Sequence, residues 1–397
     1  MTVTELGAYL DHNATTPVKP AVRDAMRAAF EQVGNPSSVH RYGALARRRA
    51  EVARAKVADL VNADPRDVVF TSGGTEANNL AITGPGRPVL VSSVEHDSVL
   101  APAREVPQGF RIAPVDGEGV IDLDALDSAL AEVGQPALVS VMLANNETGV
   151  IQPIPEVART VHAHGALLHC DAVQGAGRIP LDLASLGADL LTLSAHKLGG
   201  PMGMGALILA PGVEIKSRAT GGAQEMRRRA GTENMPGIVG FGVAADLAAK
   251  ELTAQDRTVT ALRDALEQAV GEVPGVRVHG ADAPRVGNTS CFSLAGVSSE
   301  TQVMALDLDG VAVSAGAACS SGKIGASHVL SAMGVAEAEA RCAIRVSLGA
   351  GTERAHIDRF LESWFALVRR TTKHGAAKAE IQPVALPAAQ PVAQPAA

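Results

Sequence analysis

Aromatic residues, cysteines and long apolar runs are all scarce in this chain of 397 residues. Phe, Trp and Tyr together make up 3% of it. The four cysteines, Cys170, Cys291, Cys319 and Cys342, lack the spacing of a metal site or a disulfide framework. No apolar run reaches the roughly 20 residues that a membrane-spanning helix needs. We therefore expect a protein without structural metal, disulfides or membrane spans, located in the cytoplasm.

An excess of basic residues is also missing. Lys and Arg number 35 against 42 Asp and Glu, so the net charge is −7 and the pI is about 5.9. Nucleic acids and anionic membranes attract basic surfaces, and we expect neither as a direct partner. Residues 1–10 lack the basic and apolar stretches of a signal peptide. Hydrophobic residues, at 46%, suffice for a sizeable core.

Short apolar runs alternate with amphipathic stretches over the first 250 residues or so. The runs predict buried strands, and the stretches between them predict helices. Such alternation is typical of an α/β protein with a parallel or mostly parallel sheet. The expected strands include residues 68–70, 89–91, 138–141, 167–170 and 190–193, and the expected helices include 21–31, 44–61 and 154–164.

The pattern changes after about residue 250, where a long helix is expected over residues 256–270. Short strands at 276–278 and 290–294 and a last helix near 355–370 follow it. These shorter elements indicate a smaller α+β domain. The predicted parts are an N-terminal segment packing against the small domain (1–15), a large domain (16–255), the small domain (256–371) and a disordered Ala- and Pro-rich tail (372–397).

The first motif with chemical meaning is TSGGTE, residues 71–76, which stands between a predicted strand and a predicted helix over 76–82. Its glycines let the backbone approach a ligand, and the N–H groups at a helix start face an anion. The motif therefore favours an anion site. The alternative is an ordinary strand–helix turn in which Thr75 caps the helix.

The second motif places Asp171 at the end of an apolar strand, where ligands of open α/β sheets bind. A carboxylate there needs a partner, and a protonated pyridine nitrogen is a suitable cation. The alternative is a helix cap or a structural hydrogen-bond acceptor.

The third motif is Ser194-Ala195-His196-Lys197, which directly follows a predicted buried strand. A desolvated lysine loses its proton near neutral pH and can form a Schiff base. Ser194 and His196 are placed to reach a phosphate. The alternative for Lys197 is a lysine that snorkels from a strand end. His96 also follows a strand, and its position favours a ring over a cofactor.

Cys319 stands in a run of small residues, 314–322, which indicates an accessible loop. Nucleophilic thiols need such access. The alternative is a small buried filler, which is our interpretation of the other three cysteines. Arg345 lies in an apolar, strand-like run and needs an anionic partner. A substrate carboxylate and an internal ion pair are both open for it.

Together and in this order, the motifs resemble the cysteine desulfurases of the class V aminotransferase type, from Tyr9 to about Leu367. The small-residue loop around Cys319 is similar to group I of that family, the NifS/IscS-like group, which typically feeds iron–sulfur assembly. The stretches that carry the likeness further include residues 9–17, 34–38, 95–96, 145–149, 171–174, 231–232 and 345–349.

The resemblance implies the fold type I of pyridoxal 5′-phosphate (PLP) dependent transferases. This is an α/β fold with a mostly parallel central sheet in a large domain plus a smaller α+β C-terminal domain, and it forms a homodimer. Lys197 would hold PLP as a Schiff base, Asp171 would bind the pyridine nitrogen, and His96 would stack on the ring. Thr75, Ser194 and His196 would bind the phosphate, with Thr232 from the other subunit, and Gln174 would contact the phenolic oxygen. The remaining assignments are Gly74, Glu76 and Asn146 at the cofactor, and Asn35, Asn146 and Arg345 at the substrate.

The implied reaction converts L-cysteine to L-alanine and leaves the sulfur as a persulfide on Cys319. An iron–sulfur scaffold or another acceptor protein would then take the sulfur. Lys197 would move the Cα proton, and His96 or the substrate would assist the Cys319 thiol. The alternatives are a selenocysteine lyase or another transaminase-like enzyme on the same fold, and a non-catalytic sulfur carrier or scaffold partner.

Overall fold

A seven-stranded sheet forms the centre of the larger part of the molecule. The structure is a computed structural model that describes residues 7–316 and 326–372. The strand order is β2-β8-β7-β6-β5-β3-β4, and only β8 runs antiparallel to its neighbours, so the predicted mostly parallel sheet is confirmed. The strands are β2 (Val68–Thr71), β3 (Val89–Ser92), β4 (Phe110–Ala113), β5 (Leu138–Met142), β6 (Leu167–Asp171), β7 (Leu190–Ser194) and β8 (Gly205–Leu209).

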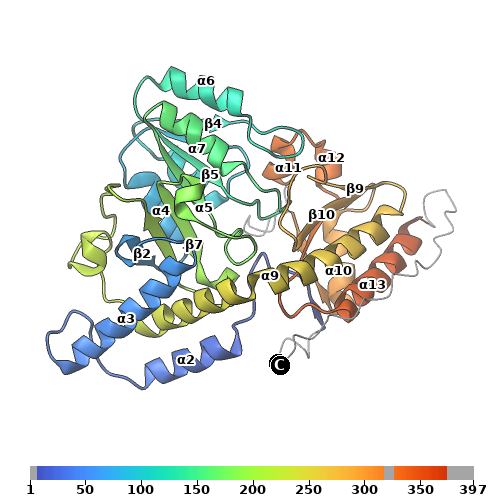
Figure 1. The fold of residues 1–397 in the computed structure, drawn as a ribbon. Helices are drawn as coiled ribbons and strands as arrows, with labels where there is room; N and C mark the ends of the chain where they lie inside the picture. Colours follow the sequence, from blue (N-terminus) through green and yellow to red (C-terminus); the bar gives the residue numbers. More distant parts are fainter. Residues whose placement is uncertain (1–6, 317–325, 373–397) are drawn as a thin grey trace.

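Helices cover both faces of this sheet, which explains why its strands are apolar without alternation (Figure 1). Every residue of β5, β7 and β8 is buried. All five strands expected from the apolar runs of the first 250 residues are present, as β2, β3, β5, β6 and β7. The helices of this part are α2 (Pro20–Phe30), α3 (Arg41–Asp59), α4 (Gly74–Thr83), α5 (Asp97–Arg104), α6 (Leu123–Val133), α7 (Ile154–Ala163) and α8 (Leu183–Leu186), and one-turn 3₁₀ helices occur at η1 (Pro65–Asp67), η2 (Ala195–Lys197) and η3 (Gln224–Arg227).

One long helix, α9 (Met235–Gly271), runs from the larger part into the smaller part (Figure 1). The expected helix over 256–270 was wrong about its start, because α9 begins 21 residues before Asp256. Buried residues of the larger core extend to Ala248 on this helix, and those of the smaller core begin at Val259. We propose that the boundary between the domains lies within α9.

The smaller part is built on a four-stranded antiparallel sheet in the order β12-β13-β10-β9. Its core packs Phe292 against Trp364, whose ring centroids lie 5.6 Å apart. The N-terminal strand β1 (Ala8–Tyr9) joins this part by parallel pairing with β11 (Val311–Ala312). The other elements are β9 (Val276–Val278), β10 (Thr289–Leu294), β12 (Ser314–Ala315), β13 (Ala343–Ser347), α10 (Ser299–Leu308), α11 (His328–Ala332), α12 (Glu337–Ala340) and α13 (Arg354–Thr372).

Two predictions of the sequence concern parts of the chain beyond the described residues. Cys319 lies there, and so does the predicted tail, except Thr372, which is the last residue of α13. Among the described residues, no helix combines the length and the apolar character that a membrane span requires.

Candidate active site

A cavity of about 270 Å³ lies where β5, β6 and β7 end and where α4 and α5 begin. This is the edge at which ligands of parallel α/β sheets bind. Its lining contains nine of the predicted site residues: Gly74, Thr75, His96, Asn146, Asp171, Gln174, Ser194, His196 and Lys197.

Asp171 is the last residue of β6 and is buried at the base of this cavity. Its Oδ2 accepts a hydrogen bond of 2.7 Å from the side-chain amide of Asn78, and its Oδ1 accepts one of 3.0 Å from the backbone N–H of Val173. Both bonds stabilise the ionised carboxylate and fix its orientation. The arrangement suits a cationic partner inside the cavity.

Lys197 follows β7 directly, at the end of the 3₁₀ turn η2. Its Nζ donates to the backbone carbonyl of Asn13 and, at 2.8 Å, to that of Ala14. Both carbonyls belong to the N-terminal segment, which therefore crosses the cavity beside the lysine. The position of Lys197 in the cavity lining agrees with the expected strand-end lysine.

The start of α4 lines one end of the cavity. The helix begins at Gly74 and its cap position is Gly73, so the alternative in which Thr75 caps the helix is wrong. N–H groups of a first helical turn lack acceptors within the helix and attract an anion. A Cβ added to Gly74 would lie 3.2 Å from a methyl of Val173 and 3.4 Å from Cβ of Ser194. Glycine thus lets the helix start approach β7 closely.

Two histidines of the cavity are neutral at pH 7. Burial, helped by the positive charge of Lys197, lowers the pKa of His196 to about 4. Its Nδ1 forms a hydrogen bond of 3.1 Å with the hydroxyl of Thr15. Burial also lowers the pKa of His96, whose Nδ1 accepts the backbone N–H of Ser98 at 3.1 Å and so caps α5. Acceptance at Nδ1 places the ring hydrogen of neutral His96 on Nε2.

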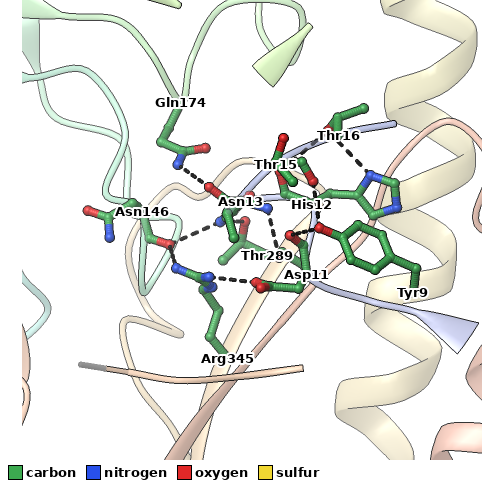
Figure 2. A network of polar contacts seen from close by, with 12 residues as sticks. Tyr9, Asp11, His12, Asn13, Thr15, Thr16, Asn146, Gln174, Thr289 and Arg345 are labelled. Atoms are coloured by element: carbon green, nitrogen blue, oxygen red, sulfur yellow. Dashed lines mark hydrogen bonds and ion pairs between the residues drawn. The ribbon is translucent and has the colours of Figure 1, made fainter. Parts of the chain in front are cut away.

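Gln174 and Arg345 both contact the N-terminal segment, as Figure 2 shows. The side-chain amide of Gln174 donates a hydrogen bond of 3.1 Å to the backbone carbonyl of Asn13. Its Oε1 accepts a hydrogen bond from Nη1 of Arg178. Arg345 donates a hydrogen bond of 2.6 Å to the carboxylate of Asp11, so an internal ion pair is present.

Arg345 also donates 3.0 Å to the backbone carbonyl of Asn146, while the side-chain amide of Asn146 points away from it (Figure 2). Arg345 does not belong to the lining of the cavity, and its Nε is buried without a hydrogen-bond partner among the described residues. A role for Arg345 at the substrate carboxylate stays a prediction.

Four other predicted site residues lie away from the cavity or beyond the described residues. Glu76 pairs with Arg229 at 2.8 Å. Thr232 lines a separate cavity of about 160 Å³, and Oδ1 of Asn35 accepts the backbone N–H of Ser37. Cys319 falls outside the described residues.

The sequence prediction assigned no role to Asn78 or Glu95. Asn78 follows Thr75 by three residues on α4, and this helical spacing is the signal that places it over the same cavity. Glu95 is fully buried, and burial raises its pKa to about 8. Its Oε1 accepts from Ser92 and from the N–H of Met142, both at 2.7 Å. Of these two neighbouring residues, Glu95 therefore lies in the core, and His96 lines the cavity.

The chain matches the family model "Aminotransferase class-V" over residues 8–360. Within the described part of the chain, no group of three or more His, Cys, Asp or Glu residues is arranged to hold a metal ion. The cavity is lined by a lysine, a carboxylate, two histidines and the start of α4.

Curated relatives agree with this family. The chain is 42% identical over 366 residues to "Cysteine desulfurase IscS" of Dictyoglomus turgidum, which covers 89% of this chain and 92% of that protein. It is 45% identical over 367 residues to a "Cysteine desulfurase" of Cereibacter sphaeroides, which covers 89% of this chain and 94% of the relative. Among solved structures, a NifS-like protein from Rickettsia africae superposes with a TM-score of 0.86 at 34% identity, over 91% of this chain and 99% of that one. The chain belongs to the class-V aminotransferase family and, within it, to the cysteine desulfurases.

Proposed function

We propose that the chain converts L-cysteine to L-alanine and carries the released sulfur as a persulfide on Cys319. The observation that carries the proposal is the meeting of Lys197, Asp171 and the start of α4 in one cavity. The family is PLP-dependent, and the names of the relatives support cysteine as the substrate.

The residues of the cavity fit PLP. The Asp171 carboxylate would bind the pyridinium nitrogen, because Asn78 and the Val173 N–H fix its orientation in the cavity. The first turn of α4 with Ser194 and His196 would bind the phosphate, and the closeness of Gly74 to Ser194 leaves this end narrow. His96 would lie against the ring, with Gln174 at the phenolic oxygen. Thr232 of a second subunit would complete the phosphate site.

Lys197 would hold the cofactor and then move the substrate Cα proton. Bound PLP supplies an electron sink for the carbanion that forms when this proton leaves. The backbone carbonyls of Asn13 and Ala14 orient the Lys197 amine. Arg345 donates a hydrogen bond of 3.0 Å to the backbone carbonyl of Asn146, and we propose that these two residues orient the substrate carboxylate.

Cys319 would perform the sulfur transfer. Its thiolate attacks the substrate sulfur, an S–S bond forms, and the substrate C–S bond breaks with its electron pair on carbon. Protonation of that carbon gives alanine, so enzyme thiol plus L-cysteine yields enzyme persulfide plus L-alanine without an added oxidant. A free thiol has a pKa near 8.5 and needs a base at pH 7. The proposed proton acceptor is His96 or the bound substrate, and His96 would have to release the N–H of Ser98 from its Nδ1 to act in this way.

Substitution of Lys197 by Ala tests the site. We expect Lys197→Ala to lose both the visible absorbance of bound PLP and sulfide release from L-cysteine. Lys250→Ala is the matched control, because its ammonium is exposed and pairs with Asp246 on the same helix, α9. Normal sulfide release by Lys197→Ala would contradict the proposed role.

We also propose that the chain forms a homodimer through α2 and α3. Phe30 is 72% exposed, Tyr42 59% and Leu45 46%, and a cavity of about 430 Å³ opens between these helices and α9. Contiguous exposed apolar surface of this kind marks an interface. Light scattering should show a dimer for the wild type and a shift toward monomer for Leu45→Glu. The control Leu308→Glu, on the 85% exposed Leu308 of α10, should remain dimeric.

An iron–sulfur scaffold or another sulfur acceptor is the proposed protein partner, and the cytoplasm is the proposed location. The name IscS of one relative supports the first. The three described cysteines, Cys170, Cys291 and Cys342, are buried free thiols, which supports a reducing compartment.

A further inference from the structure

A second, smaller cavity lies beside the active-site cavity, and Lys197 lines both. It holds about 40 Å³ between the N-terminal segment, α9 and the loop after β13. A water molecule needs roughly 10–15 Å³ by this measure, so the space suits one small ion or a few waters. The polar side chains of its lining are Thr16, Lys19, Arg178, Gln255, Asp256 and Asn288, besides Lys197.

Arg178 is the unusual member of this lining. Its side chain is buried, with the residue only 9% exposed. Nη1 donates to the carbonyl oxygen of Gln174 at 2.9 Å and to Oε1 of the same residue. A guanidinium has five N–H donors, so three remain, on Nε and Nη2. No described residue accepts a hydrogen bond from these three.

The charge of Arg178 also lacks a counter-charge. Among residues 7–316 and 326–372, no carboxylate lies within 4.0 Å of its guanidinium, whereas Lys19 in the same lining pairs with Glu251 at 2.6 Å. Asp256 lines the cavity too, but its carboxylate accepts from Thr260. Burial and the positive charge of Arg345 lower the pKa of Arg178 to about 9, so it remains charged at pH 7.

Water would satisfy the three N–H groups but would leave a buried charge without compensation, which is strongly unfavourable. An anion satisfies both requirements. We propose that this cavity binds one small monovalent inorganic anion, of about the size of chloride, at Nε and Nη2 of Arg178. The anion would hold Arg178 in the position from which Nη1 fixes the side chain of Gln174 in the active-site cavity.

Bromide is the probe, because it resembles chloride and scatters anomalously. Crystals of the PLP-loaded enzyme grown or soaked in sodium bromide should show an anomalous peak in this cavity, within hydrogen-bonding distance of Nε or Nη2 of Arg178. Bromide peaks on the protein surface with none in the cavity would overturn the proposal, whatever the behaviour of any variant.

A solution experiment separates a specific site from an adventitious ion only. The unfolding temperature of the PLP-loaded enzyme is measured at one heating rate in sodium bromide and in sodium gluconate of equal ionic strength. An anion that binds only the folded state multiplies the folding equilibrium constant about a hundredfold at 100 times its Kd, so bromide should raise the wild-type midpoint above that in gluconate.

Arg178→Gln should abolish the bromide-specific rise. Arg159→Gln, which removes an exposed arginine of α7 paired with Glu156, should retain it. Equal rises in wild type and Arg178→Gln would mean an adventitious ion only and would overturn the proposal. If Arg178→Gln fails to fold, Arg178→Lys serves, because it keeps the charge but loses the Nε–Nη2 fork, and bromide should then bind at least tenfold more weakly.

Discussion

Asn78 donates a hydrogen bond of 2.7 Å to the carboxylate of Asp171 and one of 2.8 Å to the hydroxyl of Ser98. Both hydrogens of the amide are thereby used, and the amide cannot rotate without losing a bond. Asn78 lies on α4, whose first turn lines the same cavity. One helix therefore contributes both the proposed phosphate site and the amide that orients the Asp171 carboxylate.

Removal of the Asn78 amide should weaken PLP binding. A hydrogen bond to a charged group contributes about 1.5–3 kcal/mol, so Asn78→Ala should raise the Kd of PLP about 10- to 100-fold. An absorbance titration of the apoenzyme measures this. Asn79→Ala is the control, because that amide donates to the carbonyl of Thr75 on the exposed side of the same helix. A Kd equal to that of the control would contradict the role of Asn78.

The buried ring of His169 should make the protein less stable in mild acid. Its two nitrogens contact the hydroxyls of Ser140 at 2.8 Å and Thr192 at 3.0 Å, and burial lowers its pKa to about 4. The unfolded chain gains a proton at this ring below about pH 6.5, while the folded protein does so only near 4. Stability present above pH 6.5 is therefore lost between pH 6.5 and 4.

Between pH 7 and pH 5 this single ring should cost about 2 kcal/mol. Urea unfolding at the two pH values should thus show a loss that is about 2 kcal/mol smaller in His169→Gln than in the wild type. The variant is less stable at pH 7, so only the difference between the two pH values is compared. Equal losses in the two proteins would show that His169 does not carry this pH dependence.

The buried ion pair of Arg54 and Glu225 should be important for stability. Two parallel hydrogen bonds of 2.7 and 2.9 Å join them, and Glu225 also accepts the backbone N–H of Phe70. Glu225→Ala removes the buried partner of the Arg54 guanidinium and leaves it the exposed carboxylate of Glu51, 3.2 Å away, so it should lower the free energy of unfolding by about 3–5 kcal/mol. Glu132→Ala, which breaks an exposed pair with Arg111, should cost less than about 1 kcal/mol. Similar losses for both variants in urea unfolding would refute the distinction.

The strands, and the residues that stand at their ends, were predictable because buried parallel strands are continuous apolar runs. Asp171 and Lys197 stand directly after two such runs. Because parallel strands end at the same edge of a sheet, the sequence alone indicates that these two residues share that edge. The start of α9 was missed for the opposite reason. Its first turns pack closely on α2 and α3 through small residues such as Gly237, Gly240 and Ala244. Because these buried residues are small, the sequence shows no strong apolar periodicity there.

The partners of the site residues were not predictable, because they come from distant parts of the chain. Arg345 pairs with Asp11, 334 residues away, and Asn78 meets Asp171 across 93 residues. A single sequence shows that a buried arginine or carboxylate needs a partner but not which residue supplies it. The lack of a counter-charge for Arg178 among the described residues is likewise visible only in three dimensions.

The most direct test of the desulfurase account is one turnover of the PLP-loaded enzyme with a single equivalent of L-cysteine and no sulfur acceptor. Mass spectrometry of the peptides and a parallel assay of alanine are the readouts. We predict one additional sulfur atom on the peptide that contains Cys319 and one alanine for each such sulfur. Cys319→Ser should keep the visible absorbance of PLP and form no persulfide. Alanine and sulfide formation by Cys319→Ser at the wild-type rate, or sulfur on another residue, would contradict the account.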